Sequence, residues 1–337
     1  MNDDFSWRDH ERLVRFGPGV VGEAPDLLAE RGFQDYVLLT TERAQEHWPG
    51  LEQRAIEVLH VRPGKVDEIS AELLDRVAGR PLVALGGGRV IDTGKALAGA
   101  IEGGRSAAIP TTLSGAPMSG SHRQPAAVQN ARLTRPELVI ADPALMASQP
   151  EPQMAASAMN ALAHATESLY TPLANPVAEL AALEAARLIA LGLTGAEVDR
   201  PALALAAILA GFAVGSTGLA IHHATCQTIV RVSGSPHAET NAVMLPHFAR
   251  LMATRDPGAL GALAEALGDP VGEAGAAAAL IARLAARSGH TRLSTLGVEE
   301  GQLPEIAETV QNHPALQATP EPRPSQEDLL KLLQSAL

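Results

Sequence analysis

The sequence VALGGGRVIDTGKAL (83–97) joins a short apolar run to three glycines and then to a helix-like segment. Glycines have no Cβ, so the backbone N–H groups of this turn can approach an anion closely. The following helix would direct the positive end of its dipole at the same place. The stretch lacks the G-x-G-x-x-G spacing and the Gly-Lys-Ser/Thr ending of the common phosphate loops. It therefore indicates either a diphosphate site or a tight turn between a strand and a helix.

Around this loop, strand-like and helix-like segments alternate. Strands are predicted at 35–41, 56–61, 81–87, 106–112 and 137–143, and helices at 66–79 and 93–104. Such alternation is typical of a parallel, doubly wound sheet. The pattern changes at SQPEPQ (148–153). We therefore predict an α/β domain over 1–150 and a helical domain over 151–337.

The second half is rich in Ala and Leu at helical spacing. Helical runs are predicted at 154–170, 176–193, 201–220 and 257–287, and a Pro-rich connection at 313–325 leads to a last helix at 325–336. The longest apolar stretch, LALAAILAGFAVGSTGLAI (203–221), is rich in Ala and Gly and is followed directly by two histidines. We interpret it as a buried helix and not as a membrane span.

Composition limits the classes of function. The chain has 337 residues and a formal net charge of −12, which argues against nucleic-acid binding, because phosphate contacts need a basic surface. Its one cysteine, Cys226, excludes an intrachain disulfide and fits a reducing compartment. The N-terminal segment is charged and has no apolar signal region. We therefore expect a cytoplasmic protein that binds neither nucleic acid nor a membrane.

Three further motifs follow the glycine loop in order: AAIPTTLSG (107–115), NALAHATE (160–167) and HHATCQTIVRVSGSPHAETNAVMLPH (222–247). Together they resemble the iron-dependent alcohol dehydrogenase superfamily over nearly the whole chain. The phrase SPHAETNAVMLPH and the pair His222–His223 resemble its maleylacetate reductase branch. The resemblance implies an N-terminal dinucleotide-binding domain and a C-terminal catalytic domain.

The resemblance also implies which residues hold the cofactor, NADH or NADPH. Its diphosphate would lie on the glycine loop, with further contacts at the loop after the next strand and at the first turns of the helix. The residues so assigned are Gly86, Gly87, Gly88, Asp92, Lys95, Thr111, Thr112 and Ser114. Thr41, at the end of the strand 35–41, would face the adenosine ribose. An Asp often selects NAD at that point, so a Thr leaves both cofactors open.

In the superfamily, one Asp and three His bind a metal. The matching residues here are Asn160, His164, His223 and His237. Asn160 and His164 are four residues apart and so share one helix face. A neutral amide oxygen is a poor ligand for a divalent transition metal. The resemblance to the reductase branch also implies Asn at this position, so we expect no metal, with a three-His site as the alternative.

The chain departs from its relatives at two further places. Gln227 replaces a histidine that can relay protons, and Ala116–Pro117 replaces the usual Ser-Glu pair. We assign the catalytic role to His223 and His237, which can donate a proton or a hydrogen bond to a carbonyl oxygen. His164 and His222 are supporting candidates. Cys226 and His247 are interpreted as structural, and Arg123, Arg132 and Arg231 are either carboxylate binders or surface charges.

The resemblance implies an NAD(P)H-dependent reductase, acting on a carbonyl or an activated C=C of a small carboxylated substrate, with maleylacetate as the family example. Two other possibilities keep the fold: a biosynthetic relative that catalyses a non-redox lyase or cyclase step, and a metal-dependent alcohol dehydrogenase. A non-catalytic partner subunit is a further alternative, which the intact glycine loop and histidines disfavour. The broad apolar faces of the helical half predict a homodimer.

Overall fold

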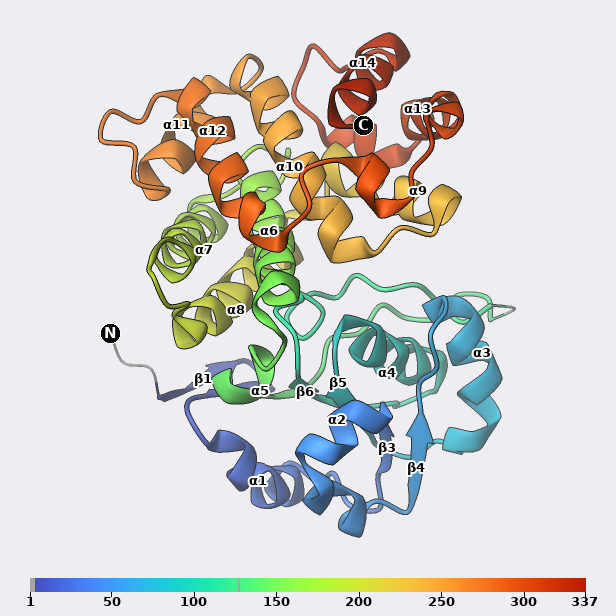
Figure 1. Ribbon diagram of the computed structural model, residues 1–337. Coiled ribbons are helices and arrows are strands. Elements are labelled where there is room, and N and C mark those ends of the chain that lie inside the picture. Colours follow the sequence, from blue (N-terminus) through green and yellow to red (C-terminus); the bar gives the residue numbers. More distant parts are fainter. Residues whose placement is uncertain (1–3, 127) are drawn as a thin grey trace. The chain divides into compact units, whose positions relative to one another are not determined.

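The structure is a computed structural model that describes residues 4–126 and 128–337 (Figure 1). Contacts divide the chain into two compact units, Met1–Ser148 and Gln149–Leu337, and each is described by itself. The first unit is an α/β fold and the second is helical. The predicted fold class is confirmed.

The N-terminal unit is built on a seven-stranded sheet of order β1-β2-β7-β6-β5-β3-β4. Its strands are β1 (Phe5–Asp9), β2 (Arg12–Phe16), β3 (Val37–Thr40), β4 (Glu57–His60), β5 (Leu82–Gly86), β6 (Ser106–Pro110) and β7 (Leu138–Ala141). All neighbouring pairs are parallel except the hairpin β1–β2. The last five strands match the predicted ones, whereas the hairpin was not predicted.

Both faces of the sheet are covered, which explains why its central strands are continuously apolar. Successive residues of one strand enter different cores: Leu38 joins one cluster, while Val37 and Leu39 join the other. The helices of this unit are α1 (Ala24–Glu30), α2 (Glu42–His47), α3 (Val66–Val77), α4 (Gly88–Ala100) and α5 (Pro143–Met146). Among them α3 and α4 pack against each other.

The helical unit contains nine α-helices among its described residues. They are α6 (Glu151–Ser168), α7 (Pro176–Thr194), α8 (Arg200–Thr217), α9 (Ile221–Ser233), α10 (His237–Ala253), α11 (Pro257–Ala266), α12 (Ala274–Ala285), α13 (Leu303–Gln311) and α14 (Gln326–Ala336). The buried helix α6 packs against α7, α8 and α10.

Three predicted helices have different limits in the structure. The run 257–287 is two helices, because Gly268 and Gly272 take positive φ angles of 101° and 68° between α11 and α12. The helix predicted at 93–104 begins earlier, at Gly88. The run 201–220 ends at Thr217, where Gly218 has a φ of 75° and the chain turns into α9.

One described helix, α8, is long and apolar enough to cross a membrane by length and composition. More than half of that window, 56%, is buried inside the structure. A core helix passes the same test, and α8 packs against α6 and α7. The packing therefore agrees with the interpretation of this stretch as a buried helix.

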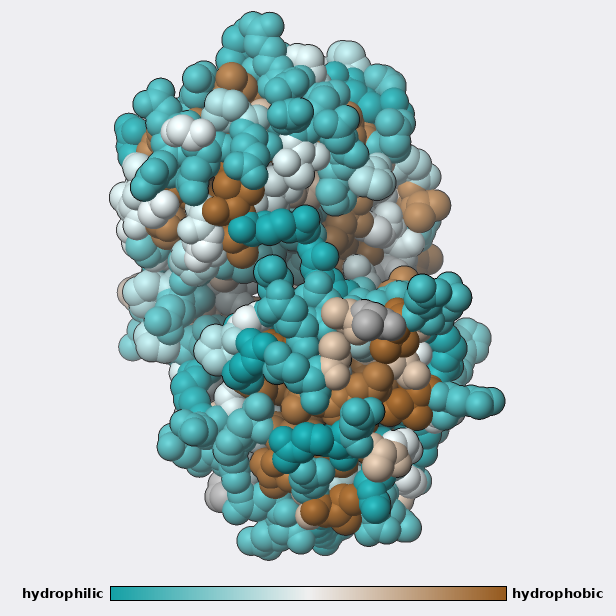
Figure 2. All heavy atoms as spheres, turned by 90° about the vertical axis from the view of Figure 1, so that its right-hand side faces the viewer, coloured by the Kyte–Doolittle hydropathy of each residue, from teal (hydrophilic) through white to brown (hydrophobic). Residues whose placement is uncertain are grey.

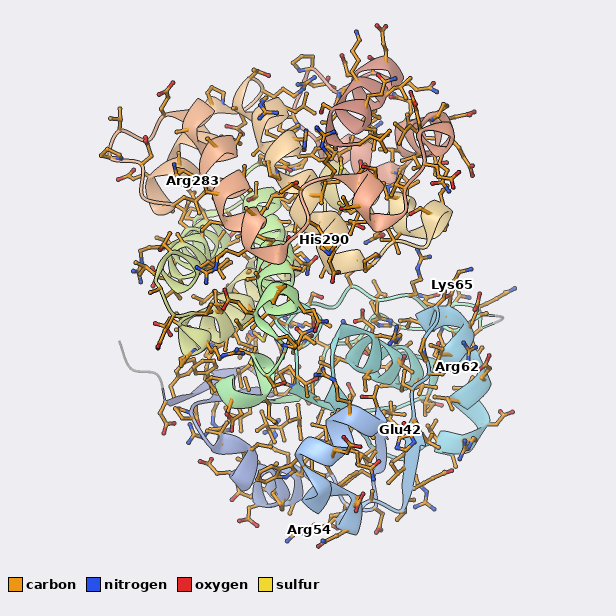
Figure 3. The ribbon with its side chains drawn as sticks, in the orientation of Figure 1. Glu42, Arg54, Arg62, Lys65, Arg283 and His290 are labelled. Carbon is orange, nitrogen blue, oxygen red and sulfur yellow. The ribbon has the colours of Figure 1, made fainter. Side chains whose placement is uncertain are left out.

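The surface of the N-terminal unit is mixed in character. On the side where α3 and β4 lie, apolar side chains gather among hydrophilic ones (Figure 2). Arg54, Arg62 and Lys65 lie at the periphery of this unit (Figure 3). Arg62 and Lys65 form exposed ion pairs with Glu72 and Glu68. Such exposed pairs contribute little to stability.

Candidate active site

The glycine loop connects β5 to α4, as the sequence predicts, and the three glycines meet three different neighbours. A Cβ on Gly86 would lie 2.7 Å from a methyl group of Val90. A Cβ on Gly87 would lie 3.0 Å from Cγ2 of Thr112, and one on Gly88 would lie 3.1 Å from Oγ of Ser114. Close packing therefore requires glycine here, whether or not an anion binds.

The beginning of α4 has the features of an anion site as well. Gly87 is the N-cap residue and offers no side-chain oxygen to the first turn, so no side chain caps the helix. The loop after β6 brings Thr112 and Ser114 against the glycines, and Oγ of Ser114 is buried without a hydrogen-bond partner. Thr111 is buried and ties this loop to β5, since its N–H donates to the Gly86 carbonyl at 3.0 Å. Uncapped N–H groups beside hydroxyls suit a phosphate.

Lys95 bonds to protein atoms and does not point an unpaired ammonium group at the glycine loop, as a phosphate ligand would. Its side chain is completely buried, and its ammonium donates to Asp92 at 2.8 Å and to the carbonyls of Ser121 and Ala116 at 2.9 and 3.1 Å. An ammonium has three hydrogens, so these bonds use all of them. Asp92 and Lys95 thus fasten the loop after β6, and the Lys95 ammonium has no hydrogen left for a phosphate.

A second buried cation, Arg12 on β2, holds the same loop and was missed by the sequence analysis. Its Nε donates to the Pro136 carbonyl at 2.9 Å, and its other nitrogens donate to the carbonyls of Pro117 and Met118. Burial lowers its pKa to about 10, with a contribution from Arg135. Arg12 donates to three backbone carbonyls, and contacts of this kind leave no motif in the sequence.

Thr41 lies just past β3, where the resemblance puts the ribose. It is the N-cap residue of α2, and its hydroxyl accepts from the Ala44 N–H at 3.3 Å. Glu42 follows it in the first turn of α2 and is exposed (Figure 3). A carboxylate therefore stands beside the predicted ribose position, a charge that the sequence analysis did not consider.

In the helical unit, three helices bring the predicted histidines together. Asn160 and His164 lie one turn apart on α6 and are both buried. His222 and His223 lie in the first turn of α9. Gly234, with a φ of 77°, ends α9, and Pro236 then begins α10, so that His237 is its first residue. Glycine is favoured at such a left-handed helix end.

The imidazoles of His164 and His223 are stacked, with centroids 4.5 Å apart and planes 6° apart. The ring of His222 meets that of His223 edge-on at 5.1 Å. Among the described residues, four buried polar atoms of this region have no hydrogen-bond partner: Oδ1 of Asn160, Nδ1 of His164, Nε2 of His223 and Oδ1 of Asn241. Buried polar atoms normally find partners, so this set indicates a place where a ligand or water completes the bonding.

Burial keeps these histidines neutral. It lowers the pKa of His164 well below the ordinary value, helped by His223 and His237. It likewise lowers the pKa of both His222 and His223 to about 3. At neutral pH each ring therefore offers one N–H and one lone pair.

Glu167 on α6 lies against this histidine cluster, and the sequence analysis quoted it but did not select it. It is completely buried, and its carboxylate accepts from Nδ1 of His223 at 2.6 Å and from the His223 backbone N–H at 3.2 Å. The backbone N–H groups of Ala220 and His222 also favour its charged form. Burial raises its pKa, and these bonds act in the opposite direction. The spacing of His164 and Glu167, three residues on one helix face, could have revealed it.

His237 is exposed, and Asn241 lies one turn further along α10. The Asn241 amide nitrogen donates to the His237 carbonyl at 2.7 Å and lies 3.3 Å from the ring Nε2 of His237. The carbonyl contact identifies this atom as the nitrogen of the amide, because two acceptors would repel. Nε2 of His237 is then an acceptor, and Nδ1 carries the hydrogen.

The residues interpreted as structural have structural surroundings. Burial raises the pKa of the Cys226 thiol, so that it is not a nucleophile. His247 bonds through Nδ1 to Ser335 on α14 at 2.8 Å.

Gln227, where the resemblance leads one to expect a histidine, is half-buried one turn after His223. The guanidinium groups of Arg123, Arg132 and Arg231 are exposed.

With this geometry established, comparison with known proteins defines the class. Residues 15–150 match the model of the iron-containing alcohol dehydrogenases, and residues 154–337 match that of the C-terminal part of the Fe-containing alcohol dehydrogenase family. The chain belongs to the iron-containing alcohol dehydrogenase family.

Within the family, its relatives include maleylacetate reductases. It is 32% identical to maleylacetate reductase 1 of Rhodococcus opacus, over 93% of this chain and 91% of that protein. It is 37% identical to maleylacetate reductase 2 of Cupriavidus pinatubonensis, over 83% and 79%. The crystal structure of maleylacetate reductase from Agrobacterium tumefaciens superposes with a TM-score of 0.83 at 29% identity, covering 100% of this chain and 99% of that one. The predicted maleylacetate reductase-like branch and the oxidoreductase class are confirmed.

The family name implies an iron ion, but the four matching residues do not fit one in this arrangement. The lone pair of an imidazole nitrogen lies in the ring plane, so one ion cannot lie in the planes of two stacked rings such as His164 and His223. Asn160 contributes only a neutral oxygen. Among the described residues one group of three possible ligands is close enough for an ion, Glu167, His222 and His223, and a hydrogen bond already joins two of them. These residues therefore do not form a metal site in this arrangement.

Proposed function

We propose that the chain is an NAD(P)H-dependent reductase that transfers hydride to the carbonyl or activated C=C of a small carboxylated substrate of the maleylacetate type, without a metal. Its similarity to two maleylacetate reductases over most of both chains supports the reaction class. The observation that carries the proposal is the set of buried, unpartnered ring nitrogens on His164 and His223, which would complete their bonds with a bound ligand or an ordered water.

The proposal assigns the nucleotide to the N-terminal unit. Its diphosphate would lie at the uncapped beginning of α4, with Thr112 and Ser114 as hydroxyl partners. When bound, the nicotinamide supplies the hydride. The protein residues hold the nucleotide and fix the packing of the loop through Lys95.

The reacting end of the substrate is assigned to the histidines of the helical unit. As hydride reaches carbon, negative charge develops on the substrate, and an imidazole N–H can stabilise or neutralise it. His237 and His223 are the two candidates for this role. The exposed ring of His237, whose Nε2 faces Asn241, leaves Nδ1 as the N–H.

A reductase assay with matched variants tests the proposal. Oxidation of NADH and NADPH is followed with 4-oxo-2-enoate dicarboxylates in wild type, His237→Ala and His247→Ala. His247 is the control, since it lies on the same helix but bonds to Ser335. We expect wild type and His247→Ala to turn over the substrate at similar rates. In His237→Ala the rate should fall by about 100-fold or more, the usual size of an acid–base contribution.

If no nicotinamide is consumed with any such substrate, the reductase proposal is wrong. Turnover of substrate without nicotinamide would favour the lyase or cyclase alternative. Equal activity in the two histidine variants would remove His237 from the mechanism and leave the reaction class intact.

We also propose that the enzyme is a cytoplasmic homodimer with a small-molecule substrate as its ligand. Exposed apolar side chains on α7, Val177 and Leu180 at 64% and 73% exposed and Leu191 at 56%, support an association face. Light scattering of the purified protein measures the mass. A monomeric mass would contradict the dimer.

A further inference from the structure

The buried carboxylate of Glu167 raises a question that the reductase proposal does not answer. A charged group in an apolar helix core is costly unless it is paired and hydrogen-bonded. Glu167 has no exposed surface, yet it lies on α6 among alanines and faces the beginning of α9. The first turn of α9 has no cap from its own N-cap residue, Ala220. Glu167 supplies that cap from another helix.

All contacts of the Glu167 carboxylate that the structure defines come from nitrogen. Oε1 receives the His223 backbone N–H at 3.2 Å, and the backbone N–H groups of Ala220 and His222 also favour the charged form of this carboxylate. A backbone N–H can only donate, and an ionised carboxylate can only accept. The positive end of the α9 dipole also favours the anion. The local geometry therefore holds Glu167 as an acceptor.

The fourth contact then fixes the imidazole. Oε2 lies 2.6 Å from Nδ1 of His223, a short distance typical of a charge-assisted bond. With Glu167 as acceptor, Nδ1 carries the hydrogen. Nε2 is buried and has no acceptor that a second ring hydrogen would need, so the ring keeps its one hydrogen on Nδ1 and leaves Nε2 bare.

We infer that Glu167 is a positioning residue that fixes His223 in the Nδ1–H tautomer, so that its Nε2 presents a lone pair to the ligand site beside Asn160 and His164. The inference rests on the proposed function only where it assigns a role in reduction. The bound group that meets Nε2 must bring a hydrogen, as a hydroxyl or a water does. A carbonyl or carboxylate oxygen is itself an acceptor and does not bind there.

This assignment separates the two catalytic candidates. The carbonyl oxygen that gains charge during reduction needs a donor, and neutral His223 offers none at Nε2. His237 carries its hydrogen on Nδ1, because Asn241 donates toward its Nε2. His237 is then the donor for the developing charge, and His223 receives the hydroxyl of the alcohol or a water.

The tautomer can be measured without cofactor or substrate. Long-range ¹H–¹⁵N correlation spectra of the ¹⁵N-labelled full chain distinguish a protonated from an unprotonated ring nitrogen, and a His223→Asn sample assigns the signals. In wild type we expect one species of His223, protonated at Nδ1 and bare at Nε2. In Glu167→Gln the side-chain amide places N–H donors against the backbone N–H groups of α9. We therefore expect His223 to lose its single tautomer, so that a fraction of its rings carries the hydrogen on Nε2.

Thr228→Val is the matched control. Its hydroxyl is buried on the same helix, donates to the Ala224 carbonyl at 2.8 Å and makes no bond to His223 among the described residues. We expect the wild-type tautomer there. Protonation of Nε2 in wild type would overturn the inference, and so would an unchanged Nδ1–H signal in Glu167→Gln. If Glu167→Gln fails to fold, the wild-type spectrum alone decides. Failure to bind NADH or NADPH would overturn the proposed function and leave the tautomer result standing.

Discussion

Replacement of Gly87 by alanine distinguishes the two roles of the glycine loop, packing and anion binding. A Cβ at this position would lie 3.0 Å from Cγ2 and 3.3 Å from Oγ1 of Thr112. Overpacking of this size costs about 1–3 kcal/mol, and we expect the lower end because the neighbour is a side chain that can move. The double variant Gly87→Ala/Thr112→Ser removes the closest atom and should recover most of the lost stability.

Nucleotide affinity should behave differently from stability. If the diphosphate bonds to the N–H groups at the beginning of α4, the added methyl keeps it away, and one lost charge-assisted bond costs about 1.5–3 kcal/mol. That corresponds to a roughly 10- to 150-fold weaker Kd. Urea denaturation measures the free energy of unfolding, and NADH fluorescence titration measures Kd, for wild type and both variants.

The double variant decides between the roles. We expect it to regain stability and to remain impaired in NADH binding. If it regains both, Gly87 serves only to pack against Thr112, and the assignment of the diphosphate to this loop is refuted.

Three further changes test other parts of the structure. Lys95→Met keeps the length of the side chain but removes its bonds to Asp92 and two carbonyls. The free energy of unfolding, measured by urea denaturation, should therefore fall by about 3 kcal/mol. A change below about 1 kcal/mol would show that Lys95 does not fasten the loop. Glu42→Gln removes the exposed carboxylate beside Thr41, which would repel the 2′-phosphate of NADPH by about 1 kcal/mol after screening. In fluorescence titrations the Kd for NADPH should fall by about fivefold, while the Kd for NADH should not change. Equal effects on both cofactors would place the 2′-phosphate elsewhere. Burial lowers the pKa of His222 to about 3, so below its unfolded pKa of about 6.5 only the unfolded chain binds the proton, and stability falls as the pH falls. From pH 6.5 to 5.0 the free energy of unfolding, measured by urea denaturation, should fall by about 1.5 kcal/mol less in His222→Gln than in wild type. Identical decreases in the two proteins would mean that His222 titrates normally in the folded state.

The parts of the fold that follow local rules could be predicted from the sequence. The alternation of apolar strands and helices around Val83–Leu97 gave five strands close to their observed limits. The hairpin Phe5–Phe16 was missed, because FSWRD is short and charged, and the edge strand β1 is stabilised by pairing with β2 and not by a continuous apolar pattern. The break at Gly268–Gly272 was missed because its flanks keep helical composition.

The candidate site was predictable in its residues but not in its geometry. Asn160 and His164 share a helix face by spacing alone, and the resemblance added His223 and His237. The stacking of His164 on His223 depends on the packing of α9 against α6, which no spacing rule supplies. For the same reason the sequence does not reveal that Glu167 caps α9.

The buried cations show a similar limit. The family resemblance assigns Lys95 to the cofactor site, yet its carbonyl partners Ala116 and Ser121 are 21 and 26 residues away. Arg12 reaches carbonyls more than 100 residues away and belongs to no motif. Such long-range bonds to backbone atoms carry no side-chain signature, so that only the structure can show them.

The central claim is a nicotinamide-dependent reductase that works without a metal. A titration of the untagged protein with NADH and NADPH, followed by fluorescence, combined with elemental analysis of iron and zinc in the same sample, tests it most directly. The account predicts saturable binding of at least one nicotinamide nucleotide, with far less than one metal ion per chain. Stoichiometric metal whose removal abolishes turnover, or the absence of nucleotide binding, would contradict it.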